Sequence, residues 1–220
     1  MTAVPAFEVY FDFDNTVTDF DVLDEIIQRF SVNEDWKLAE AAWAAGSIGS
    51  RDCLARQLAQ VRVSADALRD YLRPIRIDPA FAPILALLRS RGLEPVILSD
   101  SFTPVISAIL ENNGVAGLVI FANELRLEGD VPVVAFPYFN SICSTAANCK
   151  TSHLFRRQRP AGTRKIYVGD GQSDICPAGF CEILFAKGRL FRHYSALRRE
   201  NCFPFENLST VLSHLQLLLA

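Results

Sequence analysis

The stretch VYFDFDNTVTD, residues 9–19, places two acidic side chains directly after an apolar run. Val9, Tyr10 and Phe11 have the composition of a buried strand, yet Asp12 and Asp14 follow at once. Removing even one carboxylate from water costs several kcal/mol unless the charge is paired. An isolated acidic pair of this kind is more often a turn or a helix cap, so its meaning depends on the rest of the chain.

Strands and helices alternate on both sides of one long helical stretch. Phe7–Phe11 is a predicted buried strand, and the alternation resumes after Asp78. The further predicted strands are Pro95–Leu98, Val119–Ala122, Lys165–Val168 and Ile183–Ala186, with short extended pieces at Glu124–Leu127 and Val131–Phe136. The predicted helices are Phe81–Arg91, Pro104–Asn112, Thr151–Arg157 and Leu208–Leu219. This order predicts an α/β fold with a doubly wound, Rossmann-like parallel sheet.

The helical stretch between Asp19 and Leu72 contains no strand pattern. Its apolar residues recur at intervals of three and four, as at Leu23, Ile26, Ile27 and Phe30. We therefore expect an all-helical cap domain at residues 18–77, inserted into a core domain of residues 1–17 and 78–220. Trp36 and Trp43, one heptad apart, are predicted to lie in the core of this cap and not in a substrate wall.

Composition excludes several partners. The formal net charge of −3 gives no electrostatic reason to expect nucleic acid or a membrane surface as a partner. No apolar run approaches the roughly 18 residues that span a bilayer, and no signal-peptide pattern begins the chain, so we expect a cytoplasmic location.

The six cysteines are scattered, which favours reduced thiols, and Cys143 with Cys149 alone does not make a zinc site. Both a monomer and a homodimer remain open.

Polar residues follow three of the predicted strands. Asp12 and Asp14 follow the first; Ser99, Asp100 and Ser101 follow the second; Asp170 and Asp174 follow Lys165–Val168. In a doubly wound sheet, ligands bind beyond the carboxyl ends of the strands. Four aspartates gathered there cannot all stay ionised without a cation, and an all-oxygen acidic site selects a hard cation such as Mg²⁺.

Four short motifs occur in a recognisable order. DFDNT (12–16), LSDS (98–101), NCKTS (148–152) and GDGQSD (169–174) resemble the motifs of the haloacid dehalogenase superfamily. The helical insert after the first motif is similar to that of the phosphoserine-phosphatase-like branch. FAKGRLFRHY (185–194) and PFENL (204–208) resemble the hydroxy-keto-methylthiopentenyl phosphate phosphatases of methionine salvage, whereas LSDS and GDGQSDICP are similar to phosphoethanolamine, phosphocholine and pyridoxal phosphate phosphatases.

This resemblance implies a Mg²⁺-dependent phosphatase that acts through an aspartyl-phosphate. Asp12 would be the nucleophile, and Asp14 would protonate the leaving oxygen and then deprotonate water. Lys150 would neutralise charge on the phosphate and on Asp12. The resemblance further implies Mg²⁺ ligands from Asp12, Asp14, Asp170 and Asp174, and phosphate contacts from Thr16, Ser99, Asp100 and Lys150.

The substrate implied is a small phosphorylated metabolite, and three positions bear on which one. Asp21 stands where the phosphoserine phosphatases have a glutamate, Gln57 falls at the place of their cap arginine, and Asp100 replaces a glycine. Asp21 and Asp100 are therefore the candidate substrate-binding residues, and we expect phosphoserine to be a poor substrate. Phosphotransfer to another metabolite uses the same motifs. A phosphoacceptor signalling domain fits less well, because its acceptor lies on a middle strand of a shorter chain without an insert.

Overall fold

The computed structural model describes residues 6–140, 143, 146–156, 160 and 162–220. Seven strands form one sheet in the order β4-β3-β2-β1-β5-β6-β7. Their bounds are β1 Phe7–Phe11, β2 Val96–Phe102, β3 Val119–Glu128, β4 Val131–Ala135, β5 Arg164–Gly169, β6 Ile183–Ala186 and β7 Cys202–Pro204. Every pairing is parallel except that of β3 with β4. The predicted doubly wound α/β fold is confirmed.

The centre of the sheet is buried on both faces, as its sequence requires. All five residues of β1 are buried, which is typical of a strand covered by helices on both sides. Because successive side chains alternate, Phe7, Val9 and Phe11 pack into one hydrophobic cluster and Tyr10 into the other. Phe11 is in register with Ile97 of β2 and with Val168 of β5, so these three strands end at the same edge.

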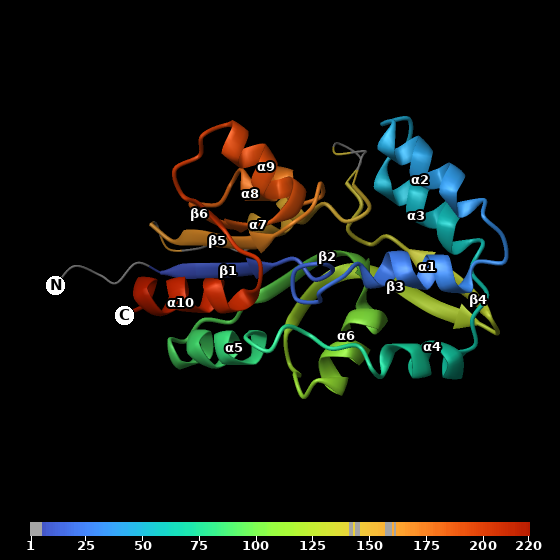
Figure 1. The fold of residues 1–220 in the computed structure, drawn as a ribbon, viewed down its shortest axis with the longest axis horizontal. Coiled ribbons are helices and arrows are strands. Elements are labelled where there is room, and N and C mark those ends of the chain that lie inside the picture. Colours follow the sequence, from blue (N-terminus) through green and yellow to red (C-terminus); the bar gives the residue numbers. More distant parts are fainter. Residues whose placement is uncertain (1–5, 141–142, 144–145, 157–159, 161) are drawn as a thin grey trace.

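Helices cover the two faces of the sheet (Figure 1). The bounds outside residues 18–77 are α5 Phe81–Ser90, α6 Thr103–Asn112, α7 Lys150–Leu154, α8 Ile175–Ala178, α9 Gly188–Ala196 and α10 Leu208–Leu218. Figure 1 shows α5, α6 and α10 on one side of the sheet and α7, α8 and α9 on the other. Within the described residues, no helix is long and apolar enough to cross a bilayer.

Residues 18–77 carry four helices and no strand longer than an isolated bridge, as predicted. They are α1 Val22–Phe30, α2 Trp36–Ala44, α3 Ser50–Leu58 and α4 Ala65–Leu72, here called the cap helices. Asp21 caps α1 by accepting from the Asp24 N–H at 2.9 Å. The two segments that connect this block to the sheet meet at a Thr18–Ile77 bridge. The division into a cap domain and a core domain stays a prediction.

The cap helices are attached to the sheet unequally. The apolar side of α1, with Val22, Leu23, Ile26 and Ile27, belongs to the same hydrophobic cluster as β1 and α5. Helices α2 and α3 instead project from a narrow neck, where the Val32 N–H donates to the Gln60 carbonyl and the Arg62 N–H to the Phe30 carbonyl, each at 2.9 Å. We call α2 and α3 with this neck the arm; Figure 1 shows α2 and α3 on the opposite side of α1 from α4, and α3 contacts β4.

Several predicted bounds were wrong. β2 runs to Phe102, not Leu98, and its register with β3 shifts between these residues. The predicted strand Val119–Ala122 and the predicted piece Glu124–Leu127 both lie within one ten-residue strand, β3, whereas the piece at Val131–Phe136 corresponds to β4. Helix α9 and strand β7 were not predicted, because only Leu190 and Tyr194 of α9 are buried and β7 has only three residues. The helix predicted at Thr151–Arg157 begins at Lys150 and ends at Leu154, and Arg157 lies outside the described residues.

Candidate active site

Three carboxylates from two strand ends converge at the edge where β1 and β5 end. One carboxylate oxygen each of Asp12, Asp170 and Asp174 lies within 4.8 Å of the others. In the part of the chain that the structure describes, no other set of three histidine, cysteine, aspartate or glutamate side chains meets this criterion, so Cys143 and Cys149 belong to no such group. Of the four aspartates that the sequence predicts at this edge, Asp12, Asp170 and Asp174 lie in this group and Asp14 does not.

Lys150 reaches these carboxylates from the start of α7. Its Nζ lies 2.7 Å from Asp12 Oδ1 and 2.7 Å from Asp174 Oδ1, and all three side chains are buried. Burial alone lowers the pKa of Lys150, but the Asp12 and Asp174 carboxylates outweigh burial and raise it well above its usual range. Lys150 is therefore a permanent cation in this site, held between two carboxylates.

Asp174 forms hydrogen bonds with Lys150 and with the turn after β5. Its Oδ1 also accepts from the Tyr167 hydroxyl at 2.7 Å, and its Oδ2 accepts from the backbone N–H groups of Asp170 at 3.1 Å and Gly171 at 2.9 Å. These bonds and the lysine contact occupy the four acceptor positions that a carboxylate offers. A Cβ at Gly169 would lie 2.7 Å from Asp174 Oδ2, so only glycine fits beside this carboxylate.

The charges of the site are unbalanced. Three carboxylates face a single ammonium, which leaves two negative charges in excess. Burial and the neighbouring Asp174 raise the pKa of Asp12 well above its usual range and that of Asp170 to about 6. Each shift records the cost of holding like charges together without water. The Asp12 and Asp170 oxygens thus fit a hard divalent cation, which would compensate the excess charge.

Asp14 and Thr16 lie in the turn that follows Asp12. Asp14 Oδ1 accepts from the Val22 N–H at 3.0 Å, which ties the start of α1 to the turn. Burial, with Asp21 nearby, raises the pKa of Asp14 to about 8. Asn15 has a φ of 57°, a left-handed conformation that asparagine tolerates better than most residues. The Thr16 hydroxyl donates to Asp170 Oδ1 at 3.4 Å.

Ser99 and Asp100 lie in the irregular part of β2. Ser99 is buried, and its Oγ accepts from the Ser101 N–H at 3.0 Å. Asp100 Oδ2 accepts from the Ser50 hydroxyl at 3.3 Å and Oδ1 from the Asn148 N–H at 3.3 Å. Burial raises the pKa of Asp100. Asp100 thus connects α3 of the arm to the segment that precedes Lys150.

A cavity of about 230 Å³ connects these residues to the cap helices. Asp21 and Gln57 line it, as does Trp43, which was predicted to lie in the cap core. That prediction was wrong for Trp43, whereas Trp36 packs against the hydrophobic core. The full lining is Asp12, Asp14, Asn15, Asp21, Leu23, Asp24, Glu40, Trp43, Ser50, Cys53, Leu54, Gln57, Ser99, Asp100, Ser101, Lys150, Asp170, Gly171, Gln172 and Ser173.

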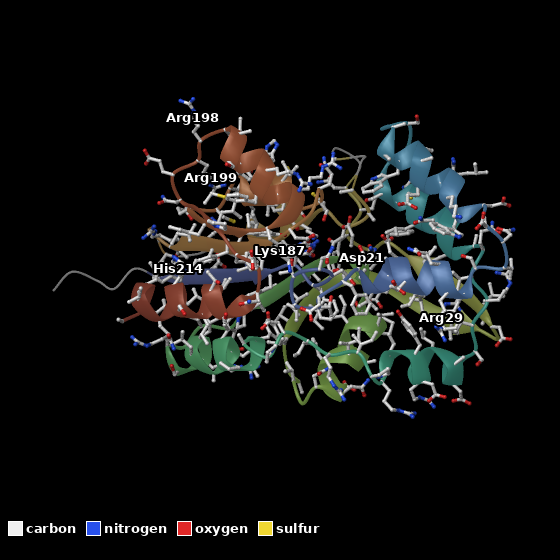
Figure 2. The ribbon with its side chains drawn as sticks, viewed as in Figure 1. Asp21, Arg29, Lys187, Arg198, Arg199 and His214 are labelled. Atoms are coloured by element: carbon white, nitrogen blue, oxygen red, sulfur yellow. The ribbon has the colours of Figure 1, made fainter. Side chains whose placement is uncertain are left out.

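The sequence reading missed the acidic wall on the cap side, Asp24 and Glu40. Burial, Asp21 and Glu40 raise the pKa of Asp24 to about 7. The spacing of Glu40 and Trp43, three residues apart on one helix, places them on the same side of α2 and was the available signal. Figure 2 shows Asp21 at the start of α1.

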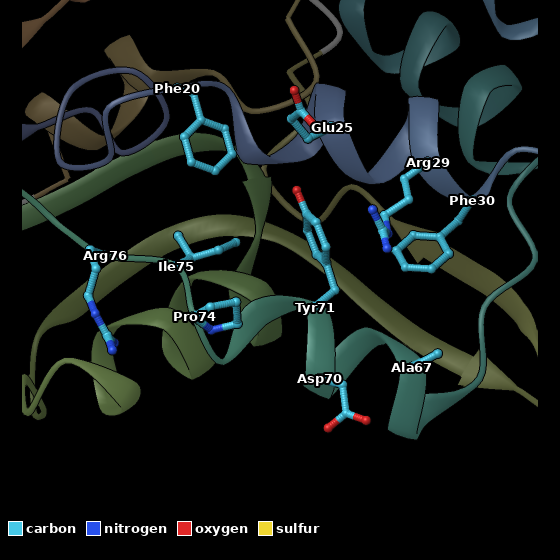
Figure 3. Close-up of a pocket in the computed structure, with 10 residues that line it drawn as sticks. All are labelled: Phe20, Glu25, Arg29, Phe30, Ala67, Asp70, Tyr71, Pro74, Ile75 and Arg76. Atoms are coloured by element: carbon cyan, nitrogen blue, oxygen red, sulfur yellow. The ribbon is translucent and has the colours of Figure 1, made fainter.

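A larger hollow of about 760 Å³ lies on the other side of α1 (Figure 3). It is lined by Phe20, Tyr71 and Ile75 among others, and by Arg29, whose guanidinium carbon is 5.6 Å from the centre of the Tyr71 ring. Its described lining contains no converging carboxylates, so the metal-site chemistry is confined to the smaller cavity.

Comparison with known proteins gives a consistent family. The model of the family described as "Putative Phosphatase" matches residues 7–185. "Pdp3-interacting factor 1" of Schizosaccharomyces pombe is 27% identical over 215 residues, 94% of each chain. A "2-hydroxy-3-keto-5-methylthiopentenyl-1-phosphate phosphatase" of Brevibacillus brevis is 24% identical over 186 residues, 83% of each chain.

The solved structures extend the agreement to the fold. The structure titled "Phospho-Aspartyl Intermediate Analogue of Phosphoserine phosphatase" aligns with a TM-score of 0.70 at 19% identity, over 96% of this chain and 98% of that one. The resemblance drawn from the four motifs is thereby confirmed. The chain belongs to the Putative Phosphatase family and is a phosphoric monoester hydrolase of the haloacid dehalogenase type.

Proposed function

We propose that the protein hydrolyses a small phosphomonoester through a covalent phosphate on Asp12. The observation that carries this proposal is the placement of Lys150 Nζ at 2.7 Å from Asp12, beside the Asp170 carboxylate. An anionic nucleophile is repelled by a phosphate dianion, and a buried cation beside the nucleophile offsets that repulsion. A covalent intermediate divides one very slow hydrolysis into two faster steps.

The Asp12 and Asp170 carboxylates would hold Mg²⁺, with the Asp14 carbonyl as the further protein ligand that the family motif implies. When bound, the ion screens the phosphate charge and polarises its P–O bonds. Asp174 was predicted as a ligand as well, but its four hydrogen bonds favour a role in holding Lys150 and the Gly169–Gly171 turn.

The remaining chemistry is assigned to the chain's own carboxylates. Asp12 attacks phosphorus while the bond to the substrate oxygen breaks and Asp14 gives its proton to that oxygen. Water then attacks phosphorus, Asp14 takes the proton from water, and the bond from Asp12 to phosphorus breaks. The burial that raises the pKa of Asp14 keeps it protonated for the first step. We propose that Ser99, Thr16 and Lys150 contact the phosphoryl oxygens, as the family resemblance implies.

Asp100 is a weaker candidate for phosphate contact. Its carboxylate would repel a phosphate, and both of its oxygens already accept hydrogen bonds, from Ser50 and from Asn148. We therefore infer that Asp100 shapes the cavity by joining the arm to the segment before Lys150.

Asp14→Asn is expected to lower kcat/KM for an alkyl phosphomonoester by about 10²- to 10⁴-fold, because the amide cannot transfer a proton. p-Nitrophenolate leaves without protonation, so the first step with p-nitrophenyl phosphate should be much less affected. The variant should then release a burst of one equivalent of nitrophenolate, followed by slow turnover, which stopped-flow absorbance can measure. Equal losses for both substrates in the burst phase would remove Asp14 from the acid role.

The cavity favours a substrate without a carboxylate. Lys150 is the only cationic side chain in its described lining, and Asp12 and Asp174 already hold it. Asp21, Asp24 and Glu40 face the same space as Trp43, an arrangement that suits an ammonium group. Gln57, only 4% exposed, makes no side-chain hydrogen bond to any described residue and is available to a substrate hydroxyl or carbonyl.

We infer that the substrate is neutral or amine-bearing beyond its phosphate. The compound named for the Brevibacillus brevis relative, 2-hydroxy-3-keto-5-methylthiopentenyl-1-phosphate, has no carboxylate and is one candidate. Phosphoethanolamine and phosphocholine, which carry an ammonium group, are candidates that the LSDS and GDGQSDICP motifs suggest, and so is pyridoxal phosphate, which has no carboxylate.

The test is kcat/KM for these four compounds and phosphoserine under identical conditions with Mg²⁺. We expect phosphoserine to be at least tenfold below the best of them, about 1.4 kcal/mol in transition-state binding. A second comparison tests whether the acidic residues Asp24 and Glu40 select a cation. It measures kcat/KM for phosphocholine and for its uncharged isostere 3,3-dimethylbutyl phosphate, in wild type and in Glu40→Gln. A tenfold lead for phosphoserine would overturn this reading of Asp21, Gln57 and Asp100.

A further inference from the structure

One buried amide connects the ends of two strands to the segment that carries Lys150. Asn148 lies two residues before Lys150 and is only 1% exposed. Its side chain donates through Nδ2 to the Ser99 carbonyl at 2.9 Å and to the Phe121 carbonyl at 2.8 Å. Ser99 belongs to β2 and Phe121 to β3. The position of Asn148 is therefore fixed against the sheet at two points.

These two bonds determine which way the Asn148 amide faces. The two strand carbonyl oxygens can only accept, so the donor Nδ2 must face them, and Oδ1 then faces His153 Nε2 at 2.7 Å. An amide oxygen can only accept, so His153 Nε2 must carry the proton of that bond. His153 Nδ1 is buried and has no partner among the described residues, which fits an unprotonated nitrogen.

The surroundings hold the His153 ring in place and keep it neutral. The ring stacks on Phe121 with centroids 4.3 Å apart and meets the edge of Tyr138 at 4.7 Å. Burial and the nearby Arg156 lower the pKa of His153 to about 4. The neutral imidazole therefore presents a fixed N–H donor to Asn148.

Lys150 lies between the two members of this pair in the sequence. The Lys150 N–H donates to the Asn148 carbonyl at 2.8 Å, and the intervening Cys149 N–H donates to the Tyr138 carbonyl at 3.1 Å. His153 follows three residues after Lys150 in the same short helix, α7. A helix of this length has little stability of its own, so contacts outside it must set its position.

We propose that His153 and Asn148 are positioning residues, which place the Lys150 ammonium between Asp12 and Asp174 by fixing α7 to the ends of β2 and β3. The inference rests on the charge-neutralising role proposed above for Lys150. Loss of the Nε2–H donor leaves the buried Asn148 Oδ1 without its partner and removes the side-chain bond between Asn148 and α7, so that α7 can move relative to the strand ends. Misplacement of a catalytic group by about 1 Å can lower a rate by about 10²-fold.

Two substitutions test the N–H donor and the aromatic ring of His153 separately. His153→Phe keeps the stacking on Phe121 and removes the donor, whereas His153→Gln keeps an N–H donor near the position of Nε2 and removes the ring. We expect His153→Phe to lower kcat by about 10- to 100-fold, and His153→Gln to restore most of it. His214→Phe, on α10 at the far end of the molecule (Figure 2), is the matched control and should keep wild-type kcat.

A second readout reports on the transition state without turnover. The Kd of orthovanadate with Mg²⁺ should rise in His153→Phe by the same factor by which kcat/KM falls, because Lys150 stabilises the phosphoryl oxygens in both. A purely structural role would lower the melting temperature and leave the vanadate Kd of the folded fraction unchanged. That outcome, or equal losses in His153→Phe and His153→Gln, would overturn the proposal.

Lys150→Met in the same assay distinguishes the two proposals. If Lys150→Met keeps its activity, the proposed function of Lys150 fails; if it loses activity while His153→Phe does not, only the positioning role fails.

Should His153→Phe not fold, ¹⁵N NMR of the wild-type imidazole at pH 7 remains decisive. We expect a protonated Nε2 and an unprotonated Nδ1, and the opposite tautomer or an imidazolium would contradict the geometry.

Discussion

Asp12→Asn abolishes phosphate release and leaves the fold intact: this is the largest effect that we expect from a single substitution. The amide nitrogen or oxygen cannot form a stable bond to phosphorus, and removal of a nucleophile can cost on the order of 10⁶-fold in kcat. The amide is nearly isosteric, and its oxygen can still accept from Lys150 Nζ. Because burial raises the pKa of Asp12, the neutral amide should not lower the melting temperature.

The measurement is phosphate release by the purified variant together with its thermal unfolding. Asp19→Asn, an exposed aspartate in the same segment, is the matched control and should keep wild-type activity. Acid quenching with a ³²P-labelled substrate should trap label on wild type and none on Asp12→Asn. Appreciable turnover by the folded variant, or label at another residue, would remove Asp12 from the nucleophilic role.

Removal of divalent metal is expected to stop the reaction completely, and added Mg²⁺ should restore it. Without a dication the Asp12, Asp170 and Asp174 carboxylates face only one ammonium, so an incoming phosphate dianion meets net negative charge. Ca²⁺ should restore little activity, because it prefers more ligands at longer distances than the roughly 2.0–2.1 Å octahedron of Mg²⁺.

Activity after treatment with excess EDTA, then with Mg²⁺ or Ca²⁺, is the direct measurement. Thermal unfolding supplies an independent one, because a ligand that binds the folded state raises its stability in proportion to ln(1 + [L]/Kd). Asp170→Asn should weaken both the Mg²⁺-dependent activity and the Mg²⁺-dependent rise in melting temperature. Full activity in excess chelator would exclude the metal from the reaction.

The sequence was informative where side-chain pattern determines backbone structure. The buried run before Asp12 and the apolar repeat in α1 each follow from burial on one or both sides, and both elements were predicted. The hydrophobic pattern did not predict the end of β2, because polar residues continue this strand beyond Leu98. Ser99 and Asp100 remain in β2 because distant groups bond to them: Asn148 Nδ2 donates to the Ser99 carbonyl at 2.9 Å, and Asn123 Nδ2 donates to the Asp100 carbonyl at 2.6 Å.

The candidate site divides in the same way. Asp12, Asp14 and Asp170 could be located from strand ends alone, because parallel strands end at one edge. Lys150 lies 138 residues from Asp12 in the chain and could be assigned only through the family motif. Asn148 stands at the start of the NCKTS motif, but its bonds and its pairing with His153 could not be predicted, because an amide that bonds two carbonyls has no characteristic spacing. The hydrogen bonds of Asn148 to His153 and to the two strand carbonyls could be identified only from the structure.

The arm formed by α2 and α3 has a consequence for how the enzyme can change. Of the cap helices, α1 supplies four side chains to the hydrophobic core, whereas α3 supplies only Leu58 and α2 none that is fully buried there. Yet Glu40, Trp43 and Gln57 of the arm line the cavity in which we propose that the substrate binds. Substitutions on this wall thus remove little of the apolar burial on which folding depends. Under the proposed function, substrate preference is set by a part of the chain that contributes little to stability, so selection can alter the preference while the phosphate-cleaving machinery and the fold persist.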